Sequence, residues 1–322
     1  MNDTDQVGVC SRSFSANPVL RAELLERYKK VKFNDAGRSL VGDSLVEFLA
    51  DCDKAITALE TVDASVLGRL PRLKVIGKYG VGLDMIDRVA MHHLGMRLGW
   101  TGGVNKRSVS ELVIAFAISL LRHVPVVNQE VRSGVWRQTV GGLLTGRVVG
   151  VVGCGHVGKD LVKLLRAFDC TVLAHDILDF PDFYRDHQVT PTALEELLQR
   201  SDIVSLHVPL DESTKGMLSA QRLALMKPDA VLINLARGGL VDEVALKHML
   251  QNRQLLAAAF DVFAQEPPQD TELLGLPNFL ATPHIGGSAR EAILAMGRSA
   301  IAGLDDHFPL DAAGRILTGD AT

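Results

Sequence analysis

Residues 148–158 read VVGVVGCGHVG, an apolar run that passes directly into a glycine-rich turn. The β-branched run predicts a buried strand, and the next segment, KDLVKLLRAF, has the apolar spacing of a helix. Glycines in a GxGxxG pattern between a strand and a helix permit a tight turn and a close approach to a pyrophosphate, which the free amides of the helix N-terminus then bind. The candidate pyrophosphate-binding residues are Gly153, Gly155, His156, Val157 and Gly158.

The next β-branched run, TVLAHD, ends at Asp176, about 20 residues beyond the glycine turn, which is the usual spacing for a ribose-binding carboxylate. A carboxylate in this place accepts hydrogen bonds from the ribose and repels a 2′-phosphate. No arginine follows within AHDILDF (174–180) to bind such a phosphate. We therefore expect the cofactor to be NAD rather than NADP.

Short β-branched runs alternate with amphipathic segments along most of the chain. This alternation is typical of a parallel sheet with crossover helices, and it begins twice, near the N-terminus and again at Arg147. We expect an α/β protein with two doubly wound parallel-sheet domains and an active site in the cleft between them, outside the carboxyl ends of the strands. The predicted domains are a flavodoxin-like substrate domain of residues 1–101 plus 288–322 and a Rossmann NAD-binding domain of residues 102–287.

Capping residues predict where two of the helices begin. Asn17 stands before Pro18, and Asn caps free amides while Pro suits the first helical position. Thr192 and Glu195 have the spacing of a capping box ahead of an apolar run.

The composition argues against several classes of protein. Hydrophobic residues make up 47% and charged residues 22% of the 322 residues, and no apolar run reaches the ~20 residues of a membrane helix. The N-terminus lacks the basic segment and apolar core of a secretory signal, so we expect a cytoplasmic protein. The net charge of −4, dispersed along the chain, does not favour nucleic acid as a partner. Four scattered cysteines without a CxxC pair predict reduced thiols and no metal site.

The segment from Ser108 to Trp136 is strongly apolar and mostly helix-forming, with an interruption expected near Pro125. A helix that is apolar over so much of its circumference is not expected to bury all of it against one small domain. We therefore expect this segment to form the interface of a homodimer, since isologous dimers are the commonest oligomers.

Polar residues gather at three further predicted strand ends, in NLARGG (234–239), DVFAQEP (261–267) and TPHIGG (282–287). Together with the glycine turn and NKRSVSELVI (105–114), these segments resemble the D-isomer-specific 2-hydroxyacid dehydrogenases over essentially the whole chain. The resemblance is greatest to the phosphoglycerate dehydrogenase branch without its common C-terminal regulatory domain. It implies an NAD-dependent oxidoreductase that interconverts a small 2-keto acid and the matching D-2-hydroxy acid.

Three residues carry the catalytic roles that the resemblance implies. Arg237 is expected to bind the substrate carboxylate and carbonyl, because a planar guanidinium suits bidentate contacts and keeps its charge. His284 is expected to be the acid/base, because an imidazole exchanges protons near neutral pH. Glu266 is expected to orient His284 and to stabilise its charged form, as a carboxylate does in a serine protease triad.

The resemblance also implies binding residues in both domains. The expected NAD contacts outside the glycine turn are Val109, Asp176, Pro209, Ala236, Asp261 and Gly286, of which Asp261 would accept from the nicotinamide carboxamide. The expected substrate contacts are Lys78, the backbone amides of Val81 and Gly82, Asn105, Arg237 and His284. His207 resembles another family position but is expected to be structural.

One segment departs from the phosphoglycerate branch. In that branch, basic and hydroxyl groups after the third strand bind the distal phosphate, whereas this chain reads TALET (57–61), with Glu60 in place of a cation. A phosphorylated substrate is therefore not expected, unless Arg12 or Lys78 supplies the missing charge.

Two other functions stay open on the sequence alone. The same family includes NAD-sensing corepressors that keep the fold as binding modules, although every proton-transfer residue is present in this chain. Relatives with the same layout oxidise other small anions, such as phosphite or formate. Turnover of NADH with a panel of keto acids distinguishes the first of these from the proposed enzyme.

Overall fold

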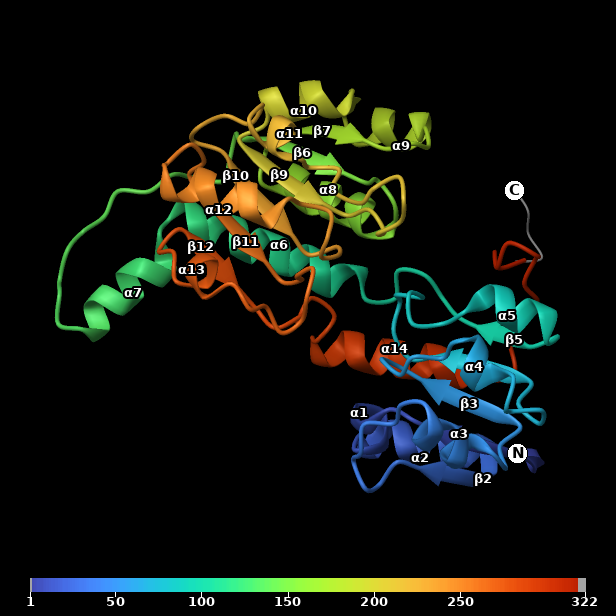
Figure 1. Ribbon diagram of the computed structural model, residues 1–322. Coiled ribbons are helices and arrows are strands. Elements are labelled where there is room, and N and C mark those ends of the chain that lie inside the picture. Colours follow the sequence, from blue (N-terminus) through green and yellow to red (C-terminus); the bar gives the residue numbers. More distant parts are fainter. Residues whose placement is uncertain (1, 318–322) are drawn as a thin grey trace. The chain divides into compact units, whose positions relative to one another are not determined.

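The computed structural model describes residues 2–317, and the chain divides into two compact units. Unit 1 comprises residues 1–105 and 290–322, and unit 2 comprises residues 106–289. The divisions lie a few residues after those expected from the sequence, because each coincides with the first residue of a helix. Each unit is a parallel sheet flanked by helices, so the expected α/β class is confirmed (Figure 1).

The sheet of unit 1 has five parallel strands in the order β2-β1-β3-β4-β5. This is the flavodoxin-like order, in which β2 lies on one side of β1 and the later strands lie on the other side. The elements of unit 1 are β1 (Asn2–Val9), α1 (Arg12–Ser15), α2 (Pro18–Arg27), β2 (Tyr28–Phe33), α3 (Asp43–Leu49), β3 (Lys54–Thr57), α4 (Ala64–Leu67), β4 (Val75–Lys78), α5 (Arg88–His93), β5 (Arg97–Gly99) and α14 (Arg290–Ala302).

Helix α14 closes unit 1 by packing its C-terminal end against β4 and β5. The contact is between backbones, because a Cβ atom on Gly99 would lie 1.9 Å from the carbonyl oxygen of Gly303. Only glycine fits at such a distance. Helix α14 is therefore fixed to the sheet at β4 and β5.

The sheet of unit 2 has seven parallel strands in the order β12-β11-β10-β9-β6-β7-β8. The order reverses between β6 and β9, and ligands of such sheets bind at this reversal, outside the carboxyl ends of the strands. The elements of unit 2 are α6 (Lys106–Leu121), α7 (Val124–Arg132), β6 (Val148–Val152), α8 (His156–Ala167), β7 (Thr171–His175), α9 (Pro181–Asp186), β8 (Val189–Pro191), α10 (Leu194–Arg200), β9 (Ile203–Leu206), α11 (Ala220–Leu223), β10 (Val231–Asn234), α12 (Glu243–Gln251), β11 (Ala257–Phe260), α13 (Thr271–Leu274) and β12 (Phe279–Ala281).

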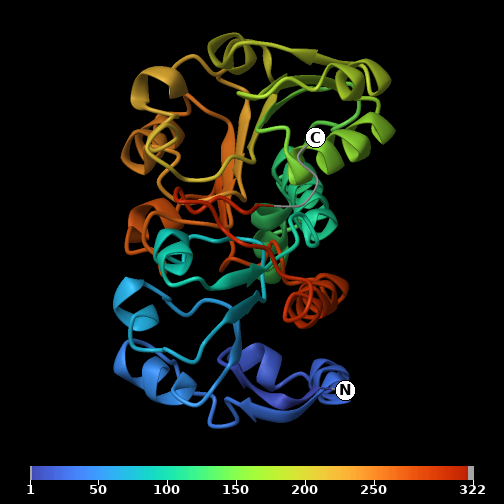
Figure 2. The same ribbon diagram turned by 90° about the vertical axis from the view of Figure 1, so that its right-hand side faces the viewer.

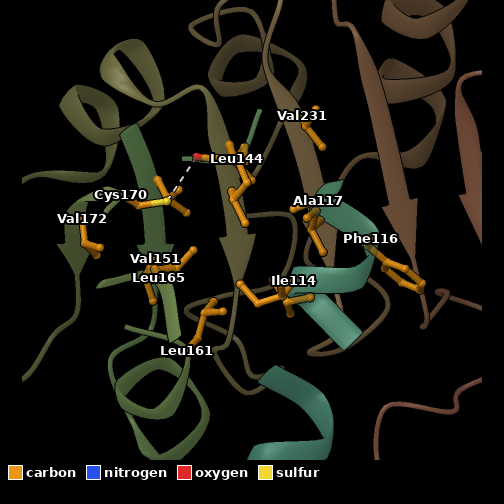
Figure 3. Close-up of a cluster of buried hydrophobic side chains, with 14 of the residues drawn as sticks. Ile114, Phe116, Ala117, Leu144, Val151, Leu161, Leu165, Cys170, Val172 and Val231 are labelled. Carbon is orange, nitrogen blue, oxygen red and sulfur yellow. Dashed lines mark hydrogen bonds between the residues drawn. The ribbon is translucent and has the colours of Figure 1, made fainter. Parts of the chain in front are cut away.

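Helices cover both faces of the seven-stranded sheet, and each face has its own apolar core (Figures 1 and 2). Figure 3 shows part of the core beneath α6 and α8, where Ile114 and Leu161 pack against Val151 of β6. The Cys170 thiol lies in the same core and donates to the carbonyl of Leu144 at 3.3 Å. The glycine turn therefore lies between a strand that is buried except at its first residue and a helix that is anchored along one face.

The apolar segment from Ser108 to Trp136 is not one surface, which corrects the expectation that all of it faces a partner. Helix α6 buries eight of its residues within unit 2, because it lies between α8 and the strands β10 and β11 and is covered on more than one side. The chain then bends by 62°, close to the expected interruption. Helix α7 has no buried residue, and it projects from unit 2 together with residues 133–143 (Figure 1).

No single helix within residues 2–317 is long and apolar enough to cross a membrane, although α6 and α7 taken together would meet that length and composition across their bend.

The two capping predictions had different outcomes. The Asn17 side chain accepts from the amides of Val19 and Leu20 and caps α2, as expected. The capping box at Thr192 is wrong, because the Thr192 amide still bonds the Ala174 carbonyl of β7 and continues the strand pairing. Helix α10 consequently begins one residue later than a cap at Thr192 would place it, with Ala193 as its N-cap and no side-chain cap.

Candidate active site

The glycine turn at the carboxyl end of β6 has the geometry of an anion-binding site. Gly153 has a φ of +94°, and a Cβ atom on Gly158 would lie 2.0 Å from the Gly153 carbonyl oxygen, so both positions require glycine. Helix α8 begins at His156 with Gly155 as its N-cap, and no side chain caps it. Its first amides are therefore available to a phosphate.

The Asp176 carboxylate lies beside this turn, directly after β7. One of its oxygens accepts from the Cys154 amide at 2.6 Å, and the other accepts from the Leu178 amide at 2.8 Å. These bonds fix the carboxylate between the glycine turn and the loop after β7. The donor set fits a dinucleotide, with amides for its pyrophosphate and a carboxylate for its ribose hydroxyl groups.

Arg237 stands in a turn after β10 that the buried Asn234 side chain holds in place. The Asn234 Oδ1 atom accepts from the Ala236 amide at 3.1 Å, and its Nδ2 atom donates to the Arg237 carbonyl at 2.9 Å. Gly238 is also tightly packed, since a Cβ atom there would lie 1.9 Å from the Phe263 carbonyl. The sequence motif contained Asn234 but no role was predicted for it; an Asn two residues before a turn amide is a recognisable signal.

His284 and Glu266 form a hydrogen-bonded pair. The Nδ1 atom of His284 lies 2.9 Å from one Glu266 oxygen, and the second Glu266 oxygen accepts from the Phe263 amide at 3.1 Å. Because Nδ1 is engaged, the Nε2 atom is the one left to exchange a proton with a substrate. Both side chains are about half exposed, at 51% for His284 and 40% for Glu266.

A hollow of about 390 Å³ lies beside this pair. Its lining is mostly apolar apart from the His284, Glu266, Thr282 and Asp261 side chains. The lining residues are Asp261, Phe263, Glu266, Pro267, Pro268, Ala281, Thr282, Pro283 and His284.

Asp261 follows β11 and is 1% exposed. Its Oδ1 atom accepts from the Thr282 hydroxyl and the Ile285 amide, and its Oδ2 atom accepts from the Gly286 amide at 2.7 Å. Both oxygens of the expected carboxamide acceptor thus already bind the segment that carries His284. This use of Asp261 was not predicted from the sequence.

The remaining expected cofactor residues are all in unit 2. Val109 is buried near Gly286, where a Cβ atom on the glycine would lie 3.6 Å from the Val109 Cγ2 atom. Ala236 is also buried, whereas Pro209 is exposed and its carbonyl accepts from the Thr214 hydroxyl. Nearby, the Nε2 atom of His207 lies 2.8 Å from the Ser205 hydroxyl, and desolvation lowers the pKa of His207 to about 3.

The expected substrate residues of unit 1 lie at the carboxyl edge of its sheet. Lys78 ends β4 and is 4% exposed, and its ammonium donates to the Ala58 carbonyl. The Val81 and Gly82 amides follow in the next loop, and neither donates to a backbone carbonyl within residues 2–317. Such amides can receive a carboxylate. Asn105, the last residue before unit 2, is partly exposed.

Glu60 also reaches this edge of unit 1. Its carboxylate accepts from the Ala58 amide at 2.6 Å, so Ala58 is contacted by Glu60 at its amide and by Lys78 at its carbonyl. Burial, and after it the Glu60 charge, raises the pKa of the Cys10 thiol at the end of β1. The negative charge that replaces a cation in this chain is thus held near the strand ends of unit 1. Arg12 is exposed in α1.

Comparison with known proteins gives a consistent set of relatives. The profile of the D-isomer specific 2-hydroxyacid dehydrogenase NAD binding domain matches residues 114–286. The D-3-phosphoglycerate dehydrogenase of Methanocaldococcus jannaschii is 34% identical over 86% of this chain and 54% of its own length. That of Bacillus subtilis is 37% identical over 72% of this chain and 45% of its own length. The chain therefore spans about half the length of these curated relatives.

Solved structures of two further proteins are similar over nearly their full length. The pyruvate reductase of Chlamydomonas reinhardtii has 27% identity and a TM-score of 0.80, over 94% of this chain and 96% of that one. A D-2-hydroxyisocaproate dehydrogenase has 25% identity and a TM-score of 0.81, over 95% of this chain and 96% of that one.

Proposed function

The chain belongs to the D-isomer-specific 2-hydroxyacid dehydrogenase family, and from that premise we propose that it reduces a small 2-keto acid to the D-2-hydroxy acid with NADH. The observation that carries the proposal is the 2.9 Å contact between Nδ1 of His284 and the Glu266 carboxylate. That contact fixes the imidazole and leaves Nε2 for the substrate. It is the arrangement that a general acid requires.

The cofactor supplies the hydride when bound. The unit 2 residues contribute its binding: the first amides of α8 receive the pyrophosphate, and Asp176 accepts from the ribose hydroxyl groups. Asp176 also repels a 2′-phosphate, which favours NAD over NADP. The same residues serve oxidation of the hydroxy acid in the reverse direction.

The chemistry at the carbonyl is assigned to three side chains. Arg237 binds the carboxylate and carbonyl oxygens and stabilises the negative charge that develops on the carbonyl oxygen. Protonated His284 donates its Nε2 proton to that oxygen, and the Glu266 charge offsets the imidazolium charge beforehand. The Val81 and Gly82 amides receive the substrate carboxylate from unit 1.

The proposed substrates are small 2-keto acids without a distal phosphate, although the curated relatives named above are phosphoglycerate dehydrogenases. Glu60 supports this choice, because it places a carboxylate near the strand ends where the phosphoglycerate branch carries cations. A carboxylate opposes the approach of a phosphate dianion.

We also propose a homodimer in which α7 and residues 133–143 contact the partner. This segment exposes Trp136 by 86%, Val140 by 92% and Leu143 by 66%, which is costly for a free surface. Light scattering at micromolar concentration tests the proposal. A mass close to twice that of the chain is expected, and a monomeric mass would contradict it.

NADH oxidation with a panel of keto acids tests the proposed reaction. Pyruvate, glyoxylate and hydroxypyruvate should be reduced, and phosphohydroxypyruvate should be a poorer substrate. If NADH binds but no acid in the panel is reduced, the nucleotide-sensing function is favoured instead.

A further inference from the structure

The loop that carries His284, residues 282–289, is held from two opposite sides. On one side, the buried Asp261 carboxylate accepts from the Ile285 and Gly286 amides, both at 2.7 Å. The Asp261 carbonyl accepts in addition from the His284 amide at 2.9 Å. Asp261 therefore binds three successive amides of the His284 loop.

On the other side, the Ser108 hydroxyl binds two backbone groups of the same loop. Its Oγ atom donates to the Gly286 carbonyl at 2.6 Å and accepts from the Ala289 amide at 3.3 Å. Both backbone polar groups of Gly286 are thus hydrogen-bonded, the amide to Asp261 and the carbonyl to Ser108. Ser108 stands in the first turn of α6, far from the loop in sequence.

The same turn of α6 is attached to the helix of the glycine turn. Arg107 donates to the buried Asp160 carboxylate of α8 at 3.0 Å. The Ser110 hydroxyl approaches the Val157 carbonyl at 3.3 Å. One helical turn therefore connects the His284 loop to the proposed nucleotide-binding helix.

His284 is the residue of the loop that needs such support. Its φ of +55° lies in the left-handed region, which is strained for a residue that carries a side chain. A side chain on such a backbone keeps its position only if the surrounding contacts determine it. The two-sided attachment at Gly286 and the pairing with Glu266 supply those contacts.

We infer that Ser108 is a positioning residue for His284: its hydroxyl fixes the Gly286 peptide so that the imidazole is held in place for proton transfer. The inference rests on the proposed function. Ser108 itself touches neither the imidazole nor the reacting atoms. Its loss should act on the rate of the chemical step and leave nucleotide binding intact.

The variant Ser108→Ala removes the hydroxyl and should lower kcat for keto-acid reduction about 10- to 100-fold, since small displacements of a catalytic group have effects of this size. The dissociation constant of NADH, measured by fluorescence, should change less than about twofold. Ser108→Thr keeps the hydroxyl and should restore most of kcat. Such a rescue would show that kcat depends on the hydrogen bonds of the hydroxyl at position 108 rather than on the size of the side chain.

Ser201→Ala is the matched control, because it removes a buried, hydrogen-bonded hydroxyl from unit 2, directly after α10, without touching the His284 loop or the glycine turn. Its kcat should stay near that of the wild type. Thermal unfolding of both variants shows whether their stabilities are similar. If Ser108→Ala and Ser201→Ala lose kcat equally, the effect is one of general stability and the inference is overturned.

A double-mutant cycle separates this inference from the proposed function. In a His284→Ala background, Ser108→Ala should cause little further loss, because it acts through the imidazole. An equal loss in both backgrounds would contradict the positioning role. If the wild-type protein reduces no keto acid, the proposed function is wrong. If His284→Ala keeps its turnover, another group carries the proton; if only Ser108→Ala is silent, the inference alone fails.

Discussion

The carboxyl edges of the two sheets hold their polar groups in different ways. In unit 2, Asn234 and Asp261 bond to backbone groups of the turns that carry Arg237 and His284. Glu266 accepts from the Phe263 amide of its own turn and contacts the His284 ring. The charged side chains proposed for catalysis therefore stand on turns that are braced by other buried or hydrogen-bonded side chains.

In unit 1, the corresponding edge consists mainly of backbone amides and two long charged side chains. Val81 and Gly82 offer amides in a loop, and Lys78 and Glu60 meet at Ala58. Few contacts depend on Glu60. Changes in unit 2 should therefore affect the reaction with every substrate, whereas a change at Glu60 should affect only the choice among substrates.

The largest effect is expected from His284→Ala in unit 2. The rate of reduction should fall roughly 10²- to 10⁴-fold with every keto acid, because a positioned general acid contributes that much. NADH affinity, measured by fluorescence, should be nearly unchanged, since the glycine turn lies elsewhere. His248→Ala, at an exposed histidine of α12, is the control. Near-wild-type turnover by His284→Ala would mean that another group carries the proton.

A smaller effect, also independent of the keto acid, is expected from Asp176→Ala. The preference for NADH over NADPH in kcat/KM should fall about 10- to 100-fold, because a hydrogen bond to a charged group is worth roughly 1.5–3 kcal/mol and the repulsion of the 2′-phosphate is also lost. Asp179→Ala, in the same loop, should leave the preference unchanged. A wild-type protein that uses NADPH as well as NADH would refute the role of Asp176.

Glu60→Gln tests the edge of unit 1. The ratio of kcat/KM for phosphohydroxypyruvate to that for hydroxypyruvate should rise about tenfold, since removal of one nearby charge is worth on the order of 1–2 kcal/mol in a partly hydrated site. The rate with glyoxylate, which has no distal group, should stay the same. Glu47→Gln, on the exposed face of α3, is the control. An equal loss with all three acids would place Glu60 in the common machinery instead.

The smallest effect on the reaction is expected from His207, at the same edge as His284. Desolvation lowers its pKa to about 3, below the ~6.5 of an unfolded chain. The unfolded state therefore binds the proton first, so the stability that His207 contributes is complete above about pH 6.5 and is lost as the pH falls toward 3. Its ring signals in NMR should not titrate between about pH 5 and 8. Titration of His207 in that range would show that its ring is hydrated.

The sequence allowed prediction of those features that depend on local pattern. The run from β6 into α8 has its strand, glycines and helix start within one short segment, and the cap at Asn17 involves only the next three residues. Roles for Arg237, Glu266 and His284 could be proposed because each stands in a local motif that resembles the family's, and these roles stay predictions.

Features that depend on contacts between distant segments were not found. Ser108 binds Gly286 and Ala289, which lie far along the chain, and nothing in the residues around Ser108 indicates this. The cap at Thr192 failed for a similar reason, because pairing with β7 at Ala174 takes up the Thr192 amide. The burial of α6 was missed because the strands that cover it come much later in the sequence.

The proposed keto-acid reduction is tested by a stoichiometric reaction with the wild-type protein. Pyruvate, glyoxylate and hydroxypyruvate are each incubated with NADH, and the hydroxy acid formed is quantified and, where it is chiral, resolved into its isomers. We expect one hydroxy acid to form for each NADH consumed, with the chiral products in the D configuration. NADH that binds but is not oxidised by any of the three acids, or a product in the L configuration, would contradict it.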